Sequence, residues 1–311
     1  MNNDPSETLT SDLRPATAAL LIVNPVSGKG RGAAIAEQAS RTLREGGLAS
    51  EVVYSRSPAD PGELARAAVR DRCPLVIGVG GDGLVSQVAS ALVGSDSVLG
   101  VVPAGVGNDF ARGLGIPLDP VQACALLTRG HARKVDVGQA NGRYFFSVAV
   151  MGFAAEVNRK ANRFRRLRAS TLYTALTVTT VFTDRPLLFT VTYDGRERRC
   201  YSWLIAVGNT WSCARGMALV PGARPDDGLL DACIVNGMGK LELLYVFPQV
   251  FRGTHIYHTG IETLRGQEIT VRADSPCEIY ADGERIGPLP VVLKAVPQAL
   301  NVMAPPRPAG P

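Results

Sequence analysis

The sequence predicts two domains of different class: an α/β domain with a parallel sheet, followed by a mostly antiparallel β-sandwich. Up to Gly130, short continuous apolar runs alternate with helical stretches of ~10–15 residues, which is the pattern of βαβ units. After Gly130, Asn-Gly or Asp-Gly pairs separate strand-like runs, and these pairs are typical of hairpin turns because both residues tolerate a positive φ. The chain has 311 residues, which is enough for two domains.

The expected elements follow from these two patterns. Apolar runs predict strands at 18–23, 51–54, 75–79 and 98–102, and the stretches after the first three predict helices at 33–45, 62–70 and 84–92. The hairpin pairs are Asn141-Gly142, Asp194-Gly195, Asp227-Gly228, Asn236-Gly237 and Asp282-Gly283. The expected limits are 17–130 for the α/β domain, which residues 296–304 can rejoin, and 131–295 for the β-rich domain, with disordered tails at 1–16 and 305–311.

Composition narrows the class of protein. Lys and Arg total 33 against 28 Asp and Glu, a net charge of +5 that is too weak for a nucleic-acid binder but compatible with anionic ligands or a membrane surface. The six cysteines form no C-x-x-C pair, which argues against a zinc site and favours reduced thiols in the cytoplasm. No apolar run is long enough to span a membrane, and the first residues lack the apolar core of a signal peptide.

Three glycine-rich loops follow predicted strands, at 24–30, 80–83 and 103–109. Because the carboxyl ends of parallel strands meet at one edge of the sheet, the loops can share one crevice, where backbone N–H groups bind phosphate. Glycine after a strand can also be a simple tight turn, so each loop alone is weak evidence. Neither a P-loop nor a dinucleotide fingerprint fits these residues.

Asp82 stands between glycines in the second loop. A carboxylate there would repel a phosphate unless it holds Mg²⁺ or accepts a proton from an attacking hydroxyl group. The alternative is that Asp82 only caps the helix that starts at Leu84. Lys29 and Arg31 can likewise meet phosphate or remain solvated, and Asn24 can contact nucleotide or merely begin the turn at Pro25.

Six ordered motifs resemble the diacylglycerol kinase catalytic family, which includes bacterial soluble lipid kinases, sphingosine kinases and ceramide kinases. They are Asn24-Pro-x-Ser-Gly28, Gly80-Gly-Asp-Gly83, Pro103-x-Gly-x-Gly-Asn-Asp-Phe-Ala-Arg112, Val135-Asp136-Val-Gly138, Pro225-Asp-Asp-Gly-Leu-Leu-Asp231 and Asp282-Gly-Glu284. Their order and spacing agree over residues 18–303. The resemblance implies transfer of the γ-phosphoryl group of ATP to a lipid hydroxyl, with a β-rich acceptor-binding domain closing over the nucleotide cleft.

The resemblance also implies roles for residues. Those expected at the nucleotide are Asn24, Ser27, Gly28, Lys29, Ser57, Gly80, Gly81, Asp82, Gly83, Gly105, Val106, Gly107, Asn108 and Asp109. The expected catalytic carboxylates are Asp82, with Mg²⁺, and Asp282 and Glu284, either of which can be the general base. Asp136 is a further expected metal residue, and Asp226, Asp227 and the Leu229 carbonyl resemble a structural magnesium site.

Some residues depart from the family pattern and leave the acceptor open. Leu84 stands where Thr is common, Gln87 where Glu is common, and Val106 where Thr is frequent, while the segment 208–213 also differs. A kinase of a non-lipid hydroxylated metabolite, an NAD-kinase-like enzyme and a non-catalytic lipid or nucleotide sensor therefore remain alternatives. Asp82, Asp282 and Glu284 argue against the sensor, because a scaffold without activity does not need these carboxylates. The long β half with its late Asp-x-Glu argues against the NAD kinase.

Two further features carry open alternatives. Asp282 and Glu284 would share one face if a strand continues through them, but Asp194-Gly195 is a similar hairpin without expected chemistry, so Asp282 can also be a plain turn residue. The segment 159–168 has six cations in ten residues, from Arg159 to Arg168. It predicts either a solvated helix face or peripheral contact with anionic lipid at the inner membrane surface, aided by Phe164 and Leu167. No nucleic-acid partner is expected, and an oligomer is possible.

Overall fold

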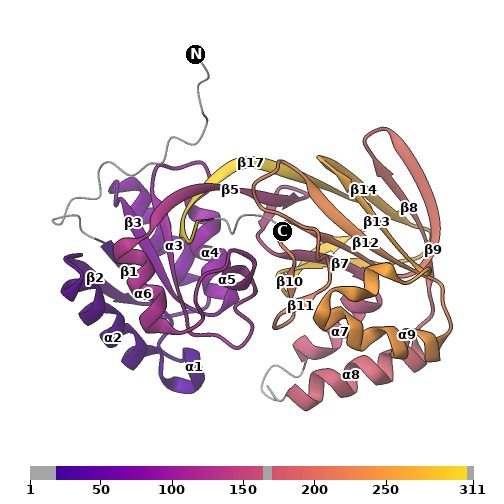
Figure 1. Ribbon diagram of the computed structural model, residues 1–311, viewed down its shortest axis with the longest axis horizontal. Coiled ribbons are helices and arrows are strands. Elements are labelled where there is room, and N and C mark those ends of the chain that lie inside the picture. Colours follow the sequence, from indigo (N-terminus) through magenta and orange to yellow (C-terminus); the bar gives the residue numbers. More distant parts are fainter. Residues whose placement is uncertain (1–18, 164–169, 307–311) are drawn as a thin grey trace. The chain divides into compact units, whose positions relative to one another are not determined.

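The computed structural model describes residues 19–163 and 170–306, and the chain divides into two units (Figure 1). Residues 1–136 and 298–311 form the first unit, and residues 137–297 form the second. Strands β5 (His131–Ala140) and β17 (Val291–Ala304) contribute to both units because the chain passes from one to the other within them. The tail predicted at 1–16 lies outside the described residues, as do residues 307–311 of the other tail.

The first unit is built on a parallel sheet with the strand order β2-β1-β3-β4-β17. Its strands are β1 (Ala19–Val23), β2 (Ser50–Tyr54), β3 (Leu75–Gly80), β4 (Val98–Pro103) and the end of β17. β3 is buried along its whole length, as expected for a parallel strand with helices on both faces. The predicted strands agree with these to within one residue, and the α/β class is confirmed.

Helices cover both faces of this sheet. On one face, α2 (Gly32–Glu45) and α6 (Pro120–Arg129) share a core with β1 and β3. α3 (Asp60–Arg70) and α4 (Asp82–Leu92) pack against each other over the other face, toward which the alternate strand side chains point. α6 begins where the carboxylate of Asp119 accepts the N–H of Gln122 at 3.0 Å. Two short helices, α1 (Ser27–Gly30) and α5 (Asp109–Gly113), follow β1 and β4 after the loops 24–26 and 104–108.

The second unit is a sandwich of two antiparallel sheets, which confirms the predicted class. The long strand β9 (Arg196–Gly208) belongs to both sheets, since residues 196–202 pair with β8 (Leu187–Tyr193) and residues 204–208 pair with β7 (Val148–Gly152). The other strands are β6 (Arg143–Phe145), β12 (Leu230–Asn236), β13 (Ile261–Gly266), β14 (Glu268–Ala273), β15 (Glu278–Ala281), β16 (Glu284–Pro288) and the small hairpin of β10 (Ser212–Cys213) and β11 (Met217–Ala218).

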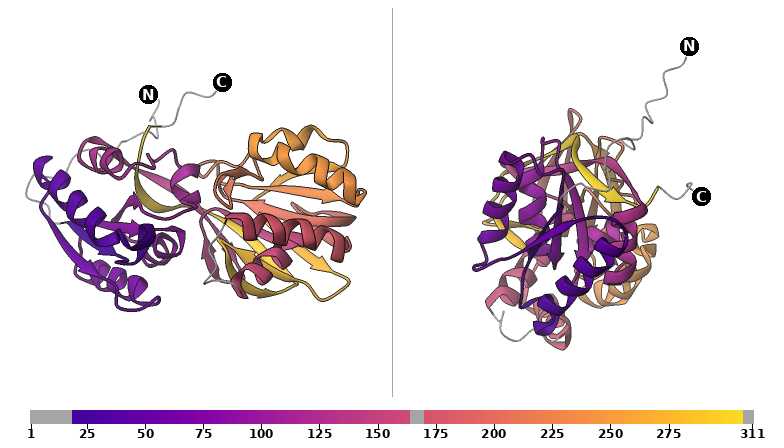
Figure 2. Two further views of the ribbon diagram at one scale, coloured as in Figure 1. Left: turned by 90° about the horizontal axis from the view of Figure 1, so that it is seen from below. Right: turned by 90° about the vertical axis from the view of Figure 1, so that its left-hand side faces the viewer.

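Alternating side chains give this unit two apolar layers. Along β7, Ala149 and Met151 point into the core between the sheets, whereas Val148 and Val150 point to the opposite face. Three helices cover that outer face: α7 (Phe153–Arg163), α8 (Ser170–Thr183) and α9 (Lys240–Val246) (Figure 2). α9 continues into the 3₁₀ turns η1 (Phe247–Arg252) and η2 (Thr254–Tyr257).

The sequence did not predict α8 or α9. α8 is rich in Thr and Val, and β-branched residues are typical of strands, so local propensity pointed away from a helix. Burial of its inner side, including Val181, against the outer face of the sheet outweighs that propensity. No helix within the described ranges combines the length and apolar character that crossing a bilayer requires.

Candidate active site

The three predicted glycine loops come together at the carboxyl ends of β1, β3 and β4 in the first unit. The N–H of Ala104, just after β4, donates to the carbonyl of Gly80 at the end of β3, at 2.8 Å. Gly28, after β1, is near enough that a Cβ there would lie 3.5 Å from the carbonyl oxygen of Ala104. The loops therefore form one surface at the sheet edge where α/β proteins bind ligands.

Two of these loops touch through glycine backbones. A Cβ on Gly105 would lie 2.4 Å from the Cα of Gly81 and 2.7 Å from Oδ1 of Asn108. No side chain fits at that distance, so any residue other than glycine at position 105 would force the second and third loops apart.

Asp82 holds the third loop in place. Its Oδ2 accepts the N–H of Asn108 at 2.7 Å, and its Oδ1 accepts the N–H of Asp109 at 2.6 Å and that of Phe110 at 3.3 Å. These donors stand at the start of α5, so Asp82 caps that helix and leaves its own helix, α4, without a side-chain cap. The alternative that Asp82 merely caps the helix beginning at Leu84 is therefore wrong.

The Asp82 carboxylate also has a second carboxylate beside it. A Cβ on Gly107 would lie 2.6 Å from Oδ2 of Asp82 and 3.0 Å from Oδ2 of Asp109, so the two groups flank the same backbone atom. Burial raises the pKa of Asp82, the Asp109 charge raises it further, and the three N–H donors oppose both. Two neighbouring carboxylates beside the glycine loops fit Mg²⁺, which proteins commonly hold through one or two carboxylates and substrate phosphates.

Side chains of the third loop complete its shape. Asn108 has a left-handed backbone, with φ of 54°, and its side chain closes on Gly105, accepting the N–H at 3.0 Å and donating to the carbonyl at 3.2 Å. Arg112 Nε donates to the Gly107 carbonyl at 3.0 Å. Arg112 belongs to the third motif, but nothing in the sequence alone indicated that it braces the loop.

A fourth loop, which follows β2, is hydrogen-bonded to α4, the helix after the second glycine loop. Nε2 of Gln87 on α4 donates to the carbonyl of Pro58 at 2.8 Å, next to the exposed Ser57. A glutamate in place of Gln87 could not make this bond, because a carboxylate has no donor. The departure at position 84 is also explained, since Leu84 is buried against Gly78 and Gly80.

The other residues predicted at the nucleotide have local roles in the structure. Oδ1 of Asn24 accepts the N–H of Val26 at 3.1 Å, which is the turn alternative, and Arg31 Nε donates to the Gly28 carbonyl at 3.2 Å. Val106 is 52% exposed at the tip of the third loop. Ser27 and Lys29 lie on α1, and the Lys29 side chain is outside the described parts.

Asp282 is fixed in the second unit. It and Gly283 form the turn between β15 and β16 with φ of 49° and 81°, and its carboxylate accepts the N–H of Phe146 at 2.7 Å and of Ser147 at 2.9 Å. The Asp194-Gly195 turn has nearly the same φ values, 46° and 75°. The two turns thus share a backbone shape. Asp282 is distinguished by the N–H groups it accepts from Phe146 and Ser147, the two residues before β7.

The expectation that Asp282 and Glu284 share one strand face is wrong. β15 ends at Ala281 and the chain reverses at the Asp-Gly turn, because both turn residues adopt positive φ. Glu284 is the first residue of β16 and is exposed.

The remaining predicted metal residues lie in two places. Asp136, in the first unit, is 1% exposed and its Oδ1 accepts the N–H of Gln298 at 2.8 Å, which ties the two crossing strands together. Asp226, Asp227 and Leu229 precede β12 in the second unit, where Asp227 is ion-paired with Arg265. Among the described residues there is no group of three His, Cys, Asp or Glu side chains able to hold a metal ion.

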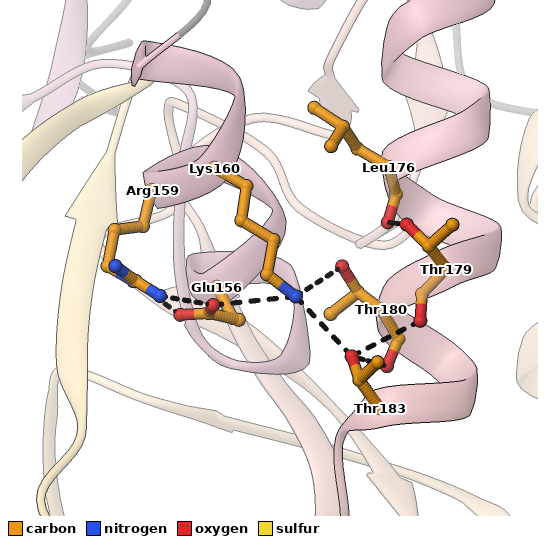
Figure 3. Close-up of polar contacts among 7 residues, drawn as sticks. All are labelled: Glu156, Arg159, Lys160, Leu176, Thr179, Thr180 and Thr183. Atoms are coloured by element: carbon orange, nitrogen blue, oxygen red, sulfur yellow. Dashed lines mark hydrogen bonds and ion pairs between the residues drawn. The ribbon is translucent and has the colours of Figure 1, made fainter.

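The second unit also contains a cavity of about 720 Å³ that sequence reasoning missed. Its lining includes Phe153, Leu187, Leu289, Tyr280, Glu156 and Arg159. Figure 3 shows the polar side of α7: Arg159 donates twice to the Glu156 carboxylate at 2.5 Å. Lys160 Nζ lies 3.5 Å from Glu156 and donates to Thr180 at 3.0 Å. The bond from Arg159 is the main cause that lowers the pKa of Glu156.

Comparison with known proteins shows which family this chain resembles. Residues 18–140 match the diacylglycerol kinase catalytic domain, and residues 147–304 match the YegS C-terminal NAD kinase beta sandwich-like domain. A diacylglycerol kinase of Mycobacterium tuberculosis (strain ATCC 25618 / H37Rv) is 35% identical over 292 residues, covering 91% of this chain and 94% of the relative. A diacylglycerol kinase of Staphylococcus aureus (strain MRSA252) is 28% identical over 290 residues, covering 92% of each chain.

Solved structures share the fold. A crystal structure of a diacylglycerol kinase from Bacillus anthracis str. Sterne aligns with a TM-score of 0.75 at 21% identity, covering 93% of this chain and 97% of that one. The glycine-loop α/β unit and the β-sandwich that follows it in the chain, together with the catalytic-domain match, define a kinase. The chain belongs to the diacylglycerol kinase family, and the resemblance seen in its motifs is confirmed.

Proposed function

We propose that this protein transfers the γ-phosphoryl group of ATP to a hydroxyl group of an uncharged lipid of the diacylglycerol class, with Mg²⁺ at the glycine loops. The observation that carries the proposal is the double role of Asp82, which caps the third loop and lies beside the Asp109 carboxylate. Such an arrangement suits a triphosphate, because the loops offer backbone N–H groups and the paired carboxylates attract a divalent cation.

In this proposal the first unit positions the nucleotide. Bound Mg²⁺ would screen the charge of the phosphate oxygens. Asp82 and Asp109 would hold it, and the close contact of Gly81 with Gly105 keeps the second and third loops at a fixed spacing. Phosphoryl transfer requires little covalent work from protein groups, so this positioning would supply much of the rate.

The second unit would supply the general base. An alcohol is a weak acid, so a carboxylate within reach must accept its proton as the new bond forms. Asp282 is the stronger candidate, because the Phe146 and Ser147 N–H groups hold its carboxylate in one orientation. Glu284 is exposed and therefore less preorganised.

The cavity in the second unit supports an uncharged acceptor. The Glu156 carboxylate already has two cationic partners, Arg159 and Lys160, so its charge is compensated within the protein. Apolar side chains such as Phe153 and Leu289 also line the space. Two more carboxylates line the cavity: Glu278 is paired with Arg285, and the charges of Lys160 and Arg159 act on Asp184. Compensated carboxylates beside apolar walls suit a neutral glycerolipid better than a cationic sphingoid base.

Peripheral membrane contact at the inner membrane surface is also part of the proposal. Arg159 and Lys160 are engaged with Glu156, so the membrane contact predicted for 159–168 would fall on Arg163, Arg165, Arg166 and Arg168, whose side chains lie outside the described parts. On α8, Val178 and Phe182 are exposed four residues apart, and the proposal has them enter the interface.

The direct test is a transfer assay. The purified protein is incubated with γ-labelled ATP and Mg²⁺, and with diacylglycerol, sphingosine, NAD or polar alcohols in parallel. The proposal expects label on diacylglycerol and at least ten-fold less on sphingosine. Label on NAD or on a polar alcohol alone would replace the lipid acceptor with that class. ATP binding without transfer to any of them would favour a sensor.

A further inference from the structure

Large apolar side chains are exposed on α9 and on the 3₁₀ turn η2 in the second unit. On α9, Leu241 is 77% exposed and Tyr245 is 73% exposed, and residues four apart lie on one side of a helix. The helix is anchored by Leu243 and Val246, which are buried in the outer apolar layer of the sandwich. Tyr257 on η2 is 83% exposed. Apolar groups of this size at one surface are typical of a docking site.

Two contacts join α9 to its neighbours. Nζ of Lys240, the first residue of α9, donates to the carbonyl of Phe182 near the end of α8 at 2.6 Å. Nε2 of His258, the residue after Tyr257, lies 3.5 Å from Oε1 of Glu242 on α9. α8 and α9 therefore lie beside each other, as Figure 1 shows, and η2 adjoins the start of α9. The exposed side chains of these three segments form the α9 surface, which comprises Phe182, Leu241, Tyr245 and Tyr257.

The charges around the α9 surface favour a partner that carries phosphate groups. Residues 238–260 contain Lys240 and Arg252 but a single carboxylate, that of Glu242. Oε2 of Glu242 accepts the N–H of Gly239 at 3.2 Å, and its other oxygen faces His258, so this carboxylate is engaged locally. Phenol rings have an apolar body and a polar tip, which suits the boundary between the acyl chains and the headgroups of a bilayer. Lysine and arginine meet lipid phosphates at the same level.

The α9 surface also adjoins residues of the cavity. Phe182 is followed in the chain by Thr183 and Asp184, and both of these line the cavity. The carbonyl that accepts the Lys240 ammonium thus belongs to the residue directly before them. A lipid surface in contact with α9 would therefore be next to the space assigned to the lipid acceptor.

We propose that the α9 surface docks on a lipid bilayer and inserts Leu241, Tyr245 and Tyr257 at the level of the headgroups. The choice of partner rests on the proposed function, because a diacylglycerol acceptor is held in a bilayer. This docking differs from the contact assigned to residues 159–168. That contact depends on charge, whereas the α9 surface binds by burying apolar side chains.

The first test measures binding to vesicles of phosphatidylcholine alone, without nucleotide. The variant Leu241→Gln/Tyr245→Gln is compared with Tyr54→Gln/Val121→Gln, which replaces two exposed apolar side chains of the first unit. Burying one large apolar side chain is worth roughly ten-fold or more in binding. The α9 variant should therefore bind at least ten-fold more weakly than the wild type, and the control should bind like the wild type. Salt should change wild-type binding little, because phosphatidylcholine has no net charge.

A second measurement separates docking from the proposed function. Transfer is followed with a short-chain diacylglycerol dissolved in water and with a long-chain diacylglycerol in the same vesicles. The α9 variant should match the wild type on the dissolved acceptor and lose at least ten-fold on the acceptor in vesicles. If the wild type labels neither acceptor, the proposed function is wrong, and vesicle binding still decides the docking surface.

Two results would overturn the docking proposal. One is equal vesicle binding by the α9 variant and the control. The other is a wild-type dimer in sedimentation velocity that the α9 variant converts into a monomer, because the surface would then pair with a second copy of the chain. If the double variant does not fold, Tyr257→Gln replaces it, since Tyr257 lies outside α9 and should by itself weaken vesicle binding several-fold.

Discussion

Asp109 acts on the Asp82 carboxylate in two opposite ways. Its backbone N–H donates to that carboxylate at 2.6 Å, while its side-chain charge raises the pKa of the same carboxylate. The backbone contact closes the third loop, and the carboxylate contact leaves two like charges together. A divalent cation is the ligand that would relieve this repulsion while keeping the loop closed.

Asp82→Ala should abolish phosphoryl transfer and also weaken the fold. Three N–H groups at positions 108–110 would lose their acceptor, which costs about 1–3 kcal/mol of unfolding free energy. Chemical denaturation and the ATP assay measure the two effects. Asp96→Ala removes an exposed aspartate of the same unit and should change neither. An Asp82→Ala protein with full activity would exclude the assigned role.

Gly105→Ala should separate the second and third loops. The added Cβ would lie 2.4 Å from the Cα of Gly81, and overpacking of this kind typically costs about 1–3 kcal/mol. Gly83→Ala is the control for stability, because a Cβ there meets nothing within 4 Å. Only Gly105→Ala should be destabilised, because Gly83 lies in α4, where alanine keeps or slightly raises stability. Equal curves would mean that the loops do not pack as described.

The sequence was most informative where local pattern and topology coincide. Apolar runs located β1, β3 and β4, and the rule for the carboxyl ends of parallel strands brought their loops together. The sequence could not show that Asp82 caps α5, because that contact joins residues 26 to 28 positions apart. The ion pair of Asp227 with Arg265 could not be predicted for the same reason, since β13 meets β12 only in the folded sheet. α8 was missed because tertiary burial overrides its β-branched composition.

Asp282→Asn should lower turnover at least a hundred-fold if Asp282 is the base, since an amide cannot accept the hydroxyl proton. Asn can still accept a backbone N–H through its oxygen, so most of the fold should survive. Asp194→Asn is the matched control, in a turn with nearly the same φ values. Steady-state rates with ATP and the lipid measure the outcome. If Glu284→Gln alone abolishes turnover and Asp282→Asn does not, Glu284 is the base.

The Glu156 pair predicts a pH effect on stability. Arg159 lowers the pKa of Glu156 from its ordinary value of 4.5, so the folded state binds the proton less readily than the unfolded state. The resulting stability is therefore present above the unfolded pKa and is lost as pH falls through the lower folded pKa. Glu156→Gln should be less stable than the wild type at pH 7, and the gap should close below about pH 4. A gap independent of pH would show that the ion pair contributes nothing.

Charge reversal of Arg163, Arg165 and Arg166 to Glu should weaken binding to vesicles that contain phosphatidylglycerol. Each cation near an anionic surface contributes up to about 1 kcal/mol, and salt screens the attraction. The triple variant should therefore lose most at low salt. The control reverses Arg41, Arg44 and Arg129, which are exposed in the first unit, and so changes the net charge equally. Co-sedimentation at several salt concentrations measures binding. If both variants bind equally, net charge alone drives the attraction and the 159–168 segment is only a solvated helix face.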